Sequence, residues 1–196
     1  MQAPQIPGTL PAADIKQLKL DAFDRSNDLK PLSVVTGDII AKNAYEWSKA
    51  TESPLAQAAV RGAEKITVRP LLGHSGKAVK LPKGASLSYD FYCDKSGDAR
   101  FTIAAIPCFL NAVKDMRVSV SIDRGEPVIC QLKEVYNSKD WQFDLWRGQT
   151  LKSFYVTLPG GSHNVTIKAL DDNVMIDQWV LDYDVDREYY VFPVAK

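Results

Sequence analysis

The segments LSYDFYC (residues 87–93) and MRVSVSID (residues 116–123) contain the pattern that decides the fold. In each segment every second residue is apolar, and the residues between them are mostly polar. Side chains of a β-strand point alternately to the two faces of a sheet, so this period of two predicts strands with one buried face. The fold is therefore expected to consist of half-buried strands.

Similar apolar segments recur along the rest of the chain, separated by turn-forming residues. They are ARFTIAAI (99–106), PVICQL (127–132), WQFDLW (141–146), SFYVTL (153–158), HNVTIKAL (163–170) and MIDQWVLDY (175–183). The connecting segments, such as DRGEP and LPGGS, are rich in residues that favour turns. About eight short strands without alternating helices predict an all-β fold, an antiparallel β-sandwich or jelly roll, and disfavour a parallel sheet.

The N-terminal part of the chain has a different composition. Residues 2–11 contain three prolines and one glycine and almost no large apolar side chains. Such a segment is typical of a tail or a linker. We therefore expect residues 1–32 to be a leader or a former interdomain linker, and residues 33–196 to form the sandwich domain.

One or two short peripheral helices are also expected. Residues 12–23 (AADIKQLKLDAF) place apolar residues at helical spacing. Residues 54–65 (PLAQAAVRGAEK) begin with a proline that follows Ser53, and serine and proline favour the cap and the first turn of a helix.

Composition excludes several classes of function. Lys and Arg (24) balance Asp and Glu (24), so no net charge attracts nucleic acid or an anionic membrane. The apolar segments are too short to cross a bilayer, and the start of the chain lacks the pattern of a signal peptide. Cys93, Cys108 and Cys130 lie in strand-like apolar segments and are expected to be buried rather than to form a disulfide framework.

Residues for catalysis are scarce. The two histidines are His74, in a glycine-flanked loop, and His163, which is expected to be a polar residue at the rim of the fold. No G-x-S-x-G serine, P-loop, dinucleotide fingerprint or CxxC pair occurs, so no enzymatic reaction and no cofactor is predicted. The aspartates near the end of the chain match no calcium loop, and no metal site is expected. Asn164, in an N-V-T glycosylation pattern, is expected to be structural because it lies within a predicted strand.

The tryptophans are the remaining candidates for ligand contact, because a flat ring at a loop offers a surface for an apolar ligand face. The same rings are also the main material of a sandwich core, and the core is the favoured position for each of them. Trp179, in the densest strand pattern, is expected in the core. Trp47 and Trp141 stand beside turn-rich segments and are the better candidates for the surface.

The order of these motifs resembles that of a known family domain. The matching segments are GDIIAKNAYEW, LLGHSGKAVKLP, LSYDFYCDKSGDARFTIAAIPCFLN, RVSVSIDRGEP, Trp141 and LPGGSHNVTIKALDDNVMIDQWVLD. Over about residues 33–193 the chain is similar to the C-terminal domain of glycoside hydrolase family 115. The most specific pieces are the Gly-x-Ser-Gly loop at residues 73–76, the Ser-Ile-Asp strand at residues 121–123, and the Pro-Gly turn with the final strand.

The resemblance implies a β-sandwich similar to carbohydrate-binding modules, which follows a barrel enzyme that removes glucuronic acid or its methyl ether from xylan. The catalytic residues belong to the barrel, so the resemblance implies that this chain is not itself an enzyme. It also implies a periplasmic or secreted bacterial protein. The chain departs from the family at residues 40–42, where Ile-Ala-Lys replaces Glu-Ala-Glu, and at Cys108, where a threonine is usual. The acids replaced help to hold a calcium ion in relatives, so the resemblance too implies no metal here.

Three functions remain open. The leading hypothesis is a non-catalytic accessory domain of a polysaccharide-degrading protein, which binds a plant cell-wall glycan or packs against a catalytic domain or a second protomer. The alternatives are a purely structural or dimerisation domain with an exposed apolar patch, and, more remotely, a small stand-alone hydrolase that uses His74. A glycan site is expected among loop residues with rings, amides or an imidazole. The candidates are Trp47, His74, Asn111, Trp141 and Asn173.

Overall fold

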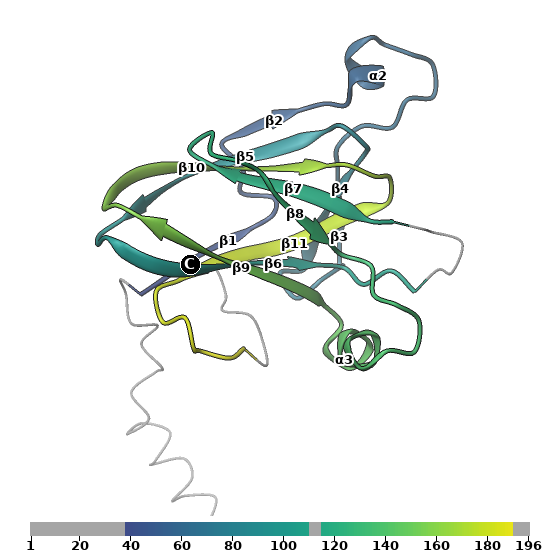
Figure 1. Ribbon diagram of the computed structural model, residues 1–196. Coiled ribbons are helices and arrows are strands. Elements are labelled where there is room, and N and C mark those ends of the chain that lie inside the picture. Colours follow the sequence, from purple (N-terminus) through teal and green to yellow (C-terminus); the bar gives the residue numbers. More distant parts are fainter. Residues whose placement is uncertain (1–37, 110–114, 190–196) are drawn as a thin grey trace, which may run out of the picture. The chain divides into compact units, whose positions relative to one another are not determined.

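The computed structural model describes residues 38–109 and 115–189, and within these residues the chain folds into two antiparallel sheets and two short helices (Figure 1). The six-stranded sheet contains β1 (Ile39–Asn43), β3 (Thr67–Pro70), β4 (Lys77–Leu81), β6 (Gly97–Ala105), β9 (Thr150–Leu158) and β11 (Val174–Asp182). The five-stranded sheet contains β2 (Lys49–Thr51), β5 (Ser86–Cys93), β7 (Arg117–Ile122), β8 (Val128–Gln131) and β10 (Gly161–Ala169). The helices are α2 (Pro54–Gln57) and α3 (Lys139–Arg147).

The two sheets stack with one hydrophobic core between them, which confirms the predicted all-β sandwich. Alternation places the apolar residues of β5 and β7 on the inner face, where Leu87, Tyr89 and Val118 are fully buried. Trp179 on β11 lies at the centre, as expected, and is fully buried. Its ring contacts those of Tyr89, Phe91 and Phe101 at centroid distances of 5.6, 5.5 and 5.3 Å.

The strand β11 organises the six-stranded sheet. One of its edges pairs with β6, while the other edge is shared by β4 over residues 174–176 and by β1 over residues 178–182. The register shifts between Ile176 and Gln178, so Asp177 lies in a bulge at the point where the partner changes. Bulges re-aim side chains, and this one directs a buried carboxylate at the loop of residues 73–76.

One predicted strand is wrong: residues 141–146 (WQFDLW) belong to helix α3. The hydroxyl of Ser138 accepts a hydrogen bond from the backbone N–H of Trp141 and caps the first turn. Gly148, in the left-handed conformation at φ +71°, ends the helix, and its N–H donates to the carbonyl of Asp144. The segment between these two caps is so short that its apolar pattern fits a strand as well as a helix.

The predicted helices are only partly confirmed, and the predicted core position of Trp146 is wrong. The second predicted helix exists as α2 with Ser53 as its cap, but it ends at Gln57 rather than extending to residue 65. The first predicted helix, residues 12–23, lies outside the described residues. The expectation of a core position is wrong for Trp146, which is 73% exposed on the outer side of α3.

The expectation for His163 is also wrong, because this side chain is buried. Its Nδ1 lies 2.5 Å from Oδ2 of Asp123, and its Nε2 lies 2.8 Å from the carbonyl oxygen of Pro159. Burial alone would lower the pKa of the imidazole, but these two acceptors outweigh burial and raise the pKa. Asn164 lies on β10, as expected, and its amide donates to Asp90 at 2.7 Å.

The expectation for the cysteines is confirmed for Cys93 and Cys130, which are buried and free. Cys108 is also free and packs against the edge of the core. Neither α2 nor α3, the helices of the described part of the chain, has the length or the apolar character needed to span a bilayer.

Candidate functional site

A pocket of about 340 Å³ lies where the chain leaves β6, enters β7 and passes from β8 to α3. We call it the aromatic pocket. It is lined by Cys108, Phe109, Asp115, Gln131, Lys133, Glu134, Val135, Tyr136 and Trp141. Its volume lies within the range of roughly 300–1,000 Å³ that is typical of small-molecule sites.

One end of the pocket is formed by three aromatic rings. The ring of Trp141 meets that of Tyr136 at a centroid distance of 5.1 Å and that of Phe109 at 5.5 Å, both edge to face. Tyr136 is 64% exposed and Phe109 is 39% exposed, so their faces are open to a ligand. Trp141 is half-buried and lies in the first turn of α3, which the Ser138 cap fixes. This end of the pocket offers apolar faces for stacking.

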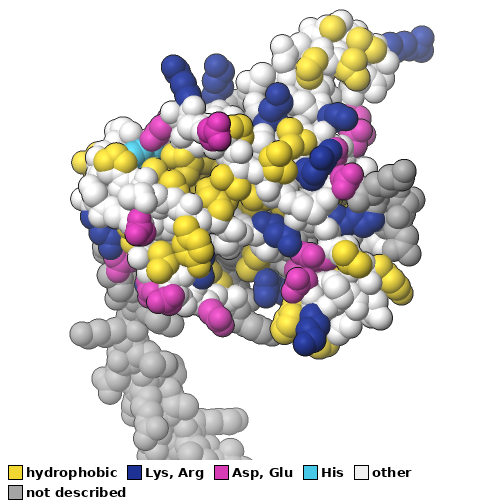
Figure 2. Space-filling model, viewed as in Figure 1, with side chains coloured by type: hydrophobic (Ala, Val, Ile, Leu, Met, Phe, Trp, Pro, Cys, Tyr) yellow, Lys and Arg dark blue, Asp and Glu magenta, His cyan; other side chains and the backbone are white. Residues whose placement is uncertain are grey.

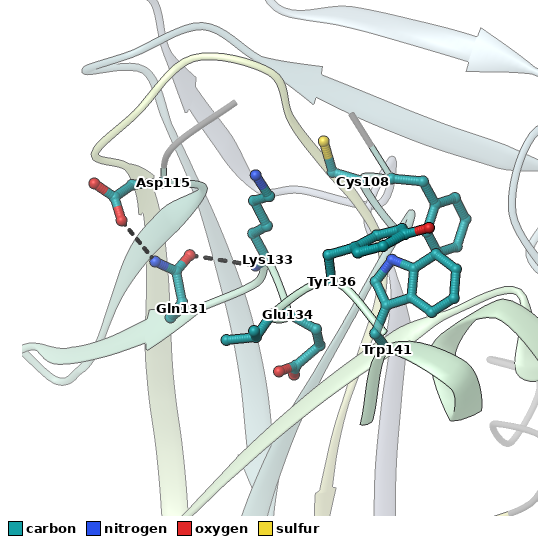
Figure 3. A pocket seen from close by; sticks show the side chains of 9 residues that line it. Cys108, Asp115, Gln131, Lys133, Glu134, Tyr136 and Trp141 are labelled. Carbon is teal, nitrogen blue, oxygen red and sulfur yellow. Dashed lines mark hydrogen bonds between the residues drawn. The ribbon is translucent and has the colours of Figure 1, made fainter. Parts of the chain in front are cut away.

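The other end of the pocket is polar (Figure 3). The side-chain oxygen of Gln131 accepts hydrogen bonds from the backbone N–H groups of Met116 and Lys133, at 3.0 and 3.2 Å. Its side-chain nitrogen donates to Oδ1 of Asp115 at 2.9 Å. Figure 3 shows the side chain of Lys133 between this pair and the rings of Tyr136 and Trp141. The pocket therefore combines apolar faces with donors and acceptors suited to hydroxyl groups.

Glu134, in the lining of the pocket, belongs to a cluster of charged groups. Glu134 forms an ion pair with Lys152 on β9, and Asp144 of α3 lies nearby and is buried. Burial raises the pKa of Asp144 to about 6, and the charge of Glu134 adds to this, while a 2.6 Å hydrogen bond from Thr150 opposes it. The charge of this cluster therefore changes just below neutral pH.

A second set of buried polar groups anchors α3 to the sheet. Asp177 is fully buried and accepts hydrogen bonds from the backbone N–H groups of His74 and Ser75, the hydroxyl of Ser75 and the side-chain amide of Gln149. Gln149 follows the cap of α3 directly. Within residues 38–109 and 115–189, no group of three or more His, Cys, Asp or Glu side chains is placed to hold a metal ion.

The candidate site residues predicted from the sequence lie in different parts of the structure. Trp141 lines the aromatic pocket, whereas Trp47 is half-buried and packs against the core. His74 lies in the loop held by Asp177, with its Nε2 beside Gly148. Asn173 forms the turn before β11 at φ +64°. Asn111 lies outside the described residues. No hydrogen bond or ring contact joins any two of the four described candidates.

Several residues of the aromatic pocket were missed by the sequence reasoning. Phe109, Gln131, Lys133 and Tyr136 lie at the ends of strands or in the connection between β8 and α3. The segment LKEVYNSKDW, residues 132–141, mixes charged and aromatic residues between two elements. That mixture is the signal by which the pocket is recognisable in the sequence, since loops on a rigid scaffold often carry binding residues.

Comparison with known proteins confirms the resemblance noted from the motifs. The model of the glycosyl hydrolase family 115 C-terminal domain matches residues 35–195. A solved structure of the family 115 4-O-methyl-α-glucuronidase BtGH115A, described as specific for decorated arabinogalactans, is 26% identical with a TM-score of 0.61. The similarity covers 74% of this chain and 17% of that chain, so this chain spans about a sixth of the length of that enzyme.

Two isolated carbohydrate-binding modules share the fold. The C-terminal family 6 module of the laminarinase LamC from Zobellia galactanivorans is 17% identical with a TM-score of 0.52, covering 74% of this chain and 99% of that chain. A family 35 module from Clostridium thermocellum is 14% identical with a TM-score of 0.51, covering 73% of this chain and 98% of that chain. No curated protein matches the chain. Because the family model covers most of the chain, the protein belongs to the glycosyl hydrolase family 115 C-terminal domain family.

Proposed function

We propose that this chain is a non-catalytic accessory domain of a longer family 115 glycoside hydrolase and that the aromatic pocket binds a glycan. The observation that carries the proposal is the pocket itself, in which the rings of Trp141, Tyr136 and Phe109 stand opposite the polar Asp115–Gln131 pair. A sugar ring has an apolar face for stacking and hydroxyl groups for hydrogen bonds, so the two ends of the pocket match its two kinds of surface.

The proposal extends to the parent protein. We place residues 1–32 in a leader or former linker to a catalytic domain, and residues 33–196 in the accessory domain. The expected partners are a plant cell-wall glycan and the catalytic domain, and the expected location is the periplasm or the exterior of a bacterial cell. The match to a family of glycoside hydrolases supports this assignment.

Packing against another domain or protomer is a second candidate function. Large apolar side chains are exposed on the outer faces of both sheets, among them Ile129 (62%) on β8 and Tyr155 (70%) on β9. Figure 2 shows hydrophobic side chains gathered over the middle of one face, between charged groups of both signs. An exposed apolar patch of this kind is typical of an interface.

Affinity electrophoresis of the full chain separates the candidates. The gels would contain glucuronoxylan, neutral xylan or arabinogalactan, and the variants would be Trp141→Ala and, as a control that also removes an exposed ring, Tyr155→Ala. We expect at least one glycan to retard the wild-type chain and Tyr155→Ala, and we expect Trp141→Ala to lose the retardation. Absence of retardation on every glycan would favour the packing function.

A further inference from the structure

A second depression lies over the outer face of the six-stranded sheet, on the opposite side of α3 from the aromatic pocket. Two adjoining pockets, of about 340 and 380 Å³, share the lining residues Phe143, Arg147, Glu188 and Tyr189. We call the two together the arginine groove. Its floor is formed by outward-facing residues of β6 and β9, namely Arg100, Thr102, Leu151 and Ser153.

Two guanidinium groups in the arginine groove form no ion pair with a described residue. The Nε of Arg100 is buried and has no hydrogen-bond partner in the described chain, and its guanidinium faces the ring of Tyr189 at 5.8 Å. Arg147 lies within electrostatic range of the buried Asp144, but it forms no hydrogen bond or ion pair with any described residue. The third arginine, Arg187, is already paired with Asp182 and Asp184, each at 3.4 Å.

The carboxylates around the groove are either exposed or already engaged. Asp182 lies opposite Arg100 in the pairing of β6 with β11, but it already accepts a hydrogen bond from Tyr189 and pairs with Arg187. Glu188 is exposed, whereas Arg100 and Arg147 are half-buried. Water screens an exposed charge strongly, while a partly desolvated guanidinium interacts more strongly with an anion. A buried guanidinium nitrogen without an acceptor is also unfavourable unless a ligand supplies the acceptor. The groove therefore favours an anion, and a planar carboxylate matches the guanidinium fork.

The other groups of the groove favour a sugar ring attached to that carboxylate. Phe143 and Trp146 are 52% and 73% exposed, and their ring centroids are 5.9 Å apart at an angle of 78°. On the floor, the hydroxyls of Thr102 and Ser153 form a hydrogen bond of 2.8 Å to each other and keep further capacity for a ligand hydroxyl. An apolar face, hydroxyl partners and two guanidinium groups are together the complement of a sugar acid.

We propose that the arginine groove binds a uronic acid residue, with its carboxylate at Arg100 and Arg147 and its ring against Phe143 or Trp146. The choice of a sugar over other carboxylates rests on the proposed function, whereas the charge argument does not. Since α3 carries Trp141 on the side of the aromatic pocket and Phe143, Trp146 and Arg147 at the groove, one helix would contact both the main chain and an acidic branch of a decorated glycan.

The test is a titration of the full ¹⁵N-labelled chain with sodium glucuronate, followed by NMR at the indole N–H of Trp146. Glucose and sodium acetate serve as probes that lack the carboxylate and the sugar ring, respectively. We expect glucuronate to shift this signal at a lower concentration than either probe, and the affinity to fall as NaCl rises from about 50 to 300 mM. Equal binding of glucose would overturn the charge argument, and equal binding of acetate would overturn the choice of a sugar acid.

Variants locate the site. Arg147→Gln and, independently, Arg100→Gln are expected to weaken glucuronate binding about tenfold or more, whereas the exposed Arg61→Gln leaves it unchanged. Far-UV circular dichroism and urea midpoints check that each variant is folded. Trp141→Ala should leave glucuronate binding unchanged, and Arg147→Gln should leave neutral-glycan binding unchanged, so failure at one site is distinguishable from failure at the other. Unchanged glucuronate affinity in both folded arginine variants contradicts the proposal.

Discussion

Gln149 donates a hydrogen bond from its side-chain amide to Oδ2 of Asp177 at 2.7 Å, and both side chains are fully buried. This contact ties the end of α3 to the bulge of β11. The same carboxylate holds the loop of residues 73–76 through His74 and Ser75. The C-terminal end of the helix that carries Trp141 is therefore held to the sheet by one buried acid.

Replacing this acid should weaken the whole domain. Each carboxylate oxygen of Asp177 accepts from a backbone N–H, of His74 or of Ser75, so the amide nitrogen of Asp177→Asn costs at least one of these hydrogen bonds. We expect the free energy of unfolding to fall by about 2–3 kcal/mol, measured by urea denaturation. Asp172→Asn is the control, because Asp172 is exposed and accepts a single bond of 3.3 Å from the backbone of Lys83. An equal loss in the two variants would show that the Asp177 network has no special importance.

The loop of residues 73–76 offers a matched pair of glycines. Gly73 and Gly76 have similar left-handed backbones, at φ +80° and +75°, so alanine is strained at both. A Cβ at Gly73 would lie 2.3 Å from Oδ1 of Asp177, whereas a Cβ at Gly76 meets nothing within 4 Å. We expect Gly76→Ala to cost about 1 kcal/mol of stability and Gly73→Ala considerably more. Thermal midpoints that fall equally would contradict the close contact.

The buried Asp144 should make stability depend on pH. Its pKa is raised from 3.8 to about 6, so the folded state holds the proton more tightly than the unfolded chain does. The stabilisation from this proton is therefore complete below about pH 4 and is lost as the pH rises through about 6. The free energy of unfolding falls by about 2–3 kcal/mol over this range. Urea midpoints measured from pH 4 to 7 should show this slope in the wild type and in Asp140→Asn, an exposed carboxylate of the same helix, and a flatter profile in Asp144→Asn.

The cap of α3 is a further test of how the pocket is held. Ser138→Ala removes the acceptor for the N–H of Trp141, and we expect a loss of about 1 kcal/mol in stability. Ser138→Asp keeps an acceptor at this position and should restore the wild-type value. Chemical denaturation of the two variants gives the comparison. A stable alanine variant would mean that packing of α3 alone fixes Trp141.

The sequence predicts the sandwich well because its strands have one inner and one outer face, as in β5 and β7. The core position of Trp179 follows from the same alternation. The segment WQFDLW was misassigned because six residues fit both periods, and the caps at Ser138 and Gly148 decide for a helix.

The candidate site was less predictable. Trp141 and Tyr136 are five residues apart, but Phe109 reaches them only through the folding of distant strands. The chemistry of His163 also depends on a distant residue, Asp123, 40 positions away along the chain. Contacts between segments far apart in the sequence leave no periodic signal, so single-sequence reasoning finds the fold more readily than the site.

The central claim is that the aromatic pocket binds a glycan, and the most direct measurement follows the four tryptophan indole N–H signals of the ¹⁵N-labelled chain by NMR. Trp141→Phe identifies the signal of Trp141, and xylo-oligosaccharides or arabinogalactan oligosaccharides are then titrated. The proposal predicts a saturable shift of the Trp141 signal, while the buried Trp179 stays unchanged. A Trp141 signal that does not move with any of these glycans at millimolar concentration would contradict it.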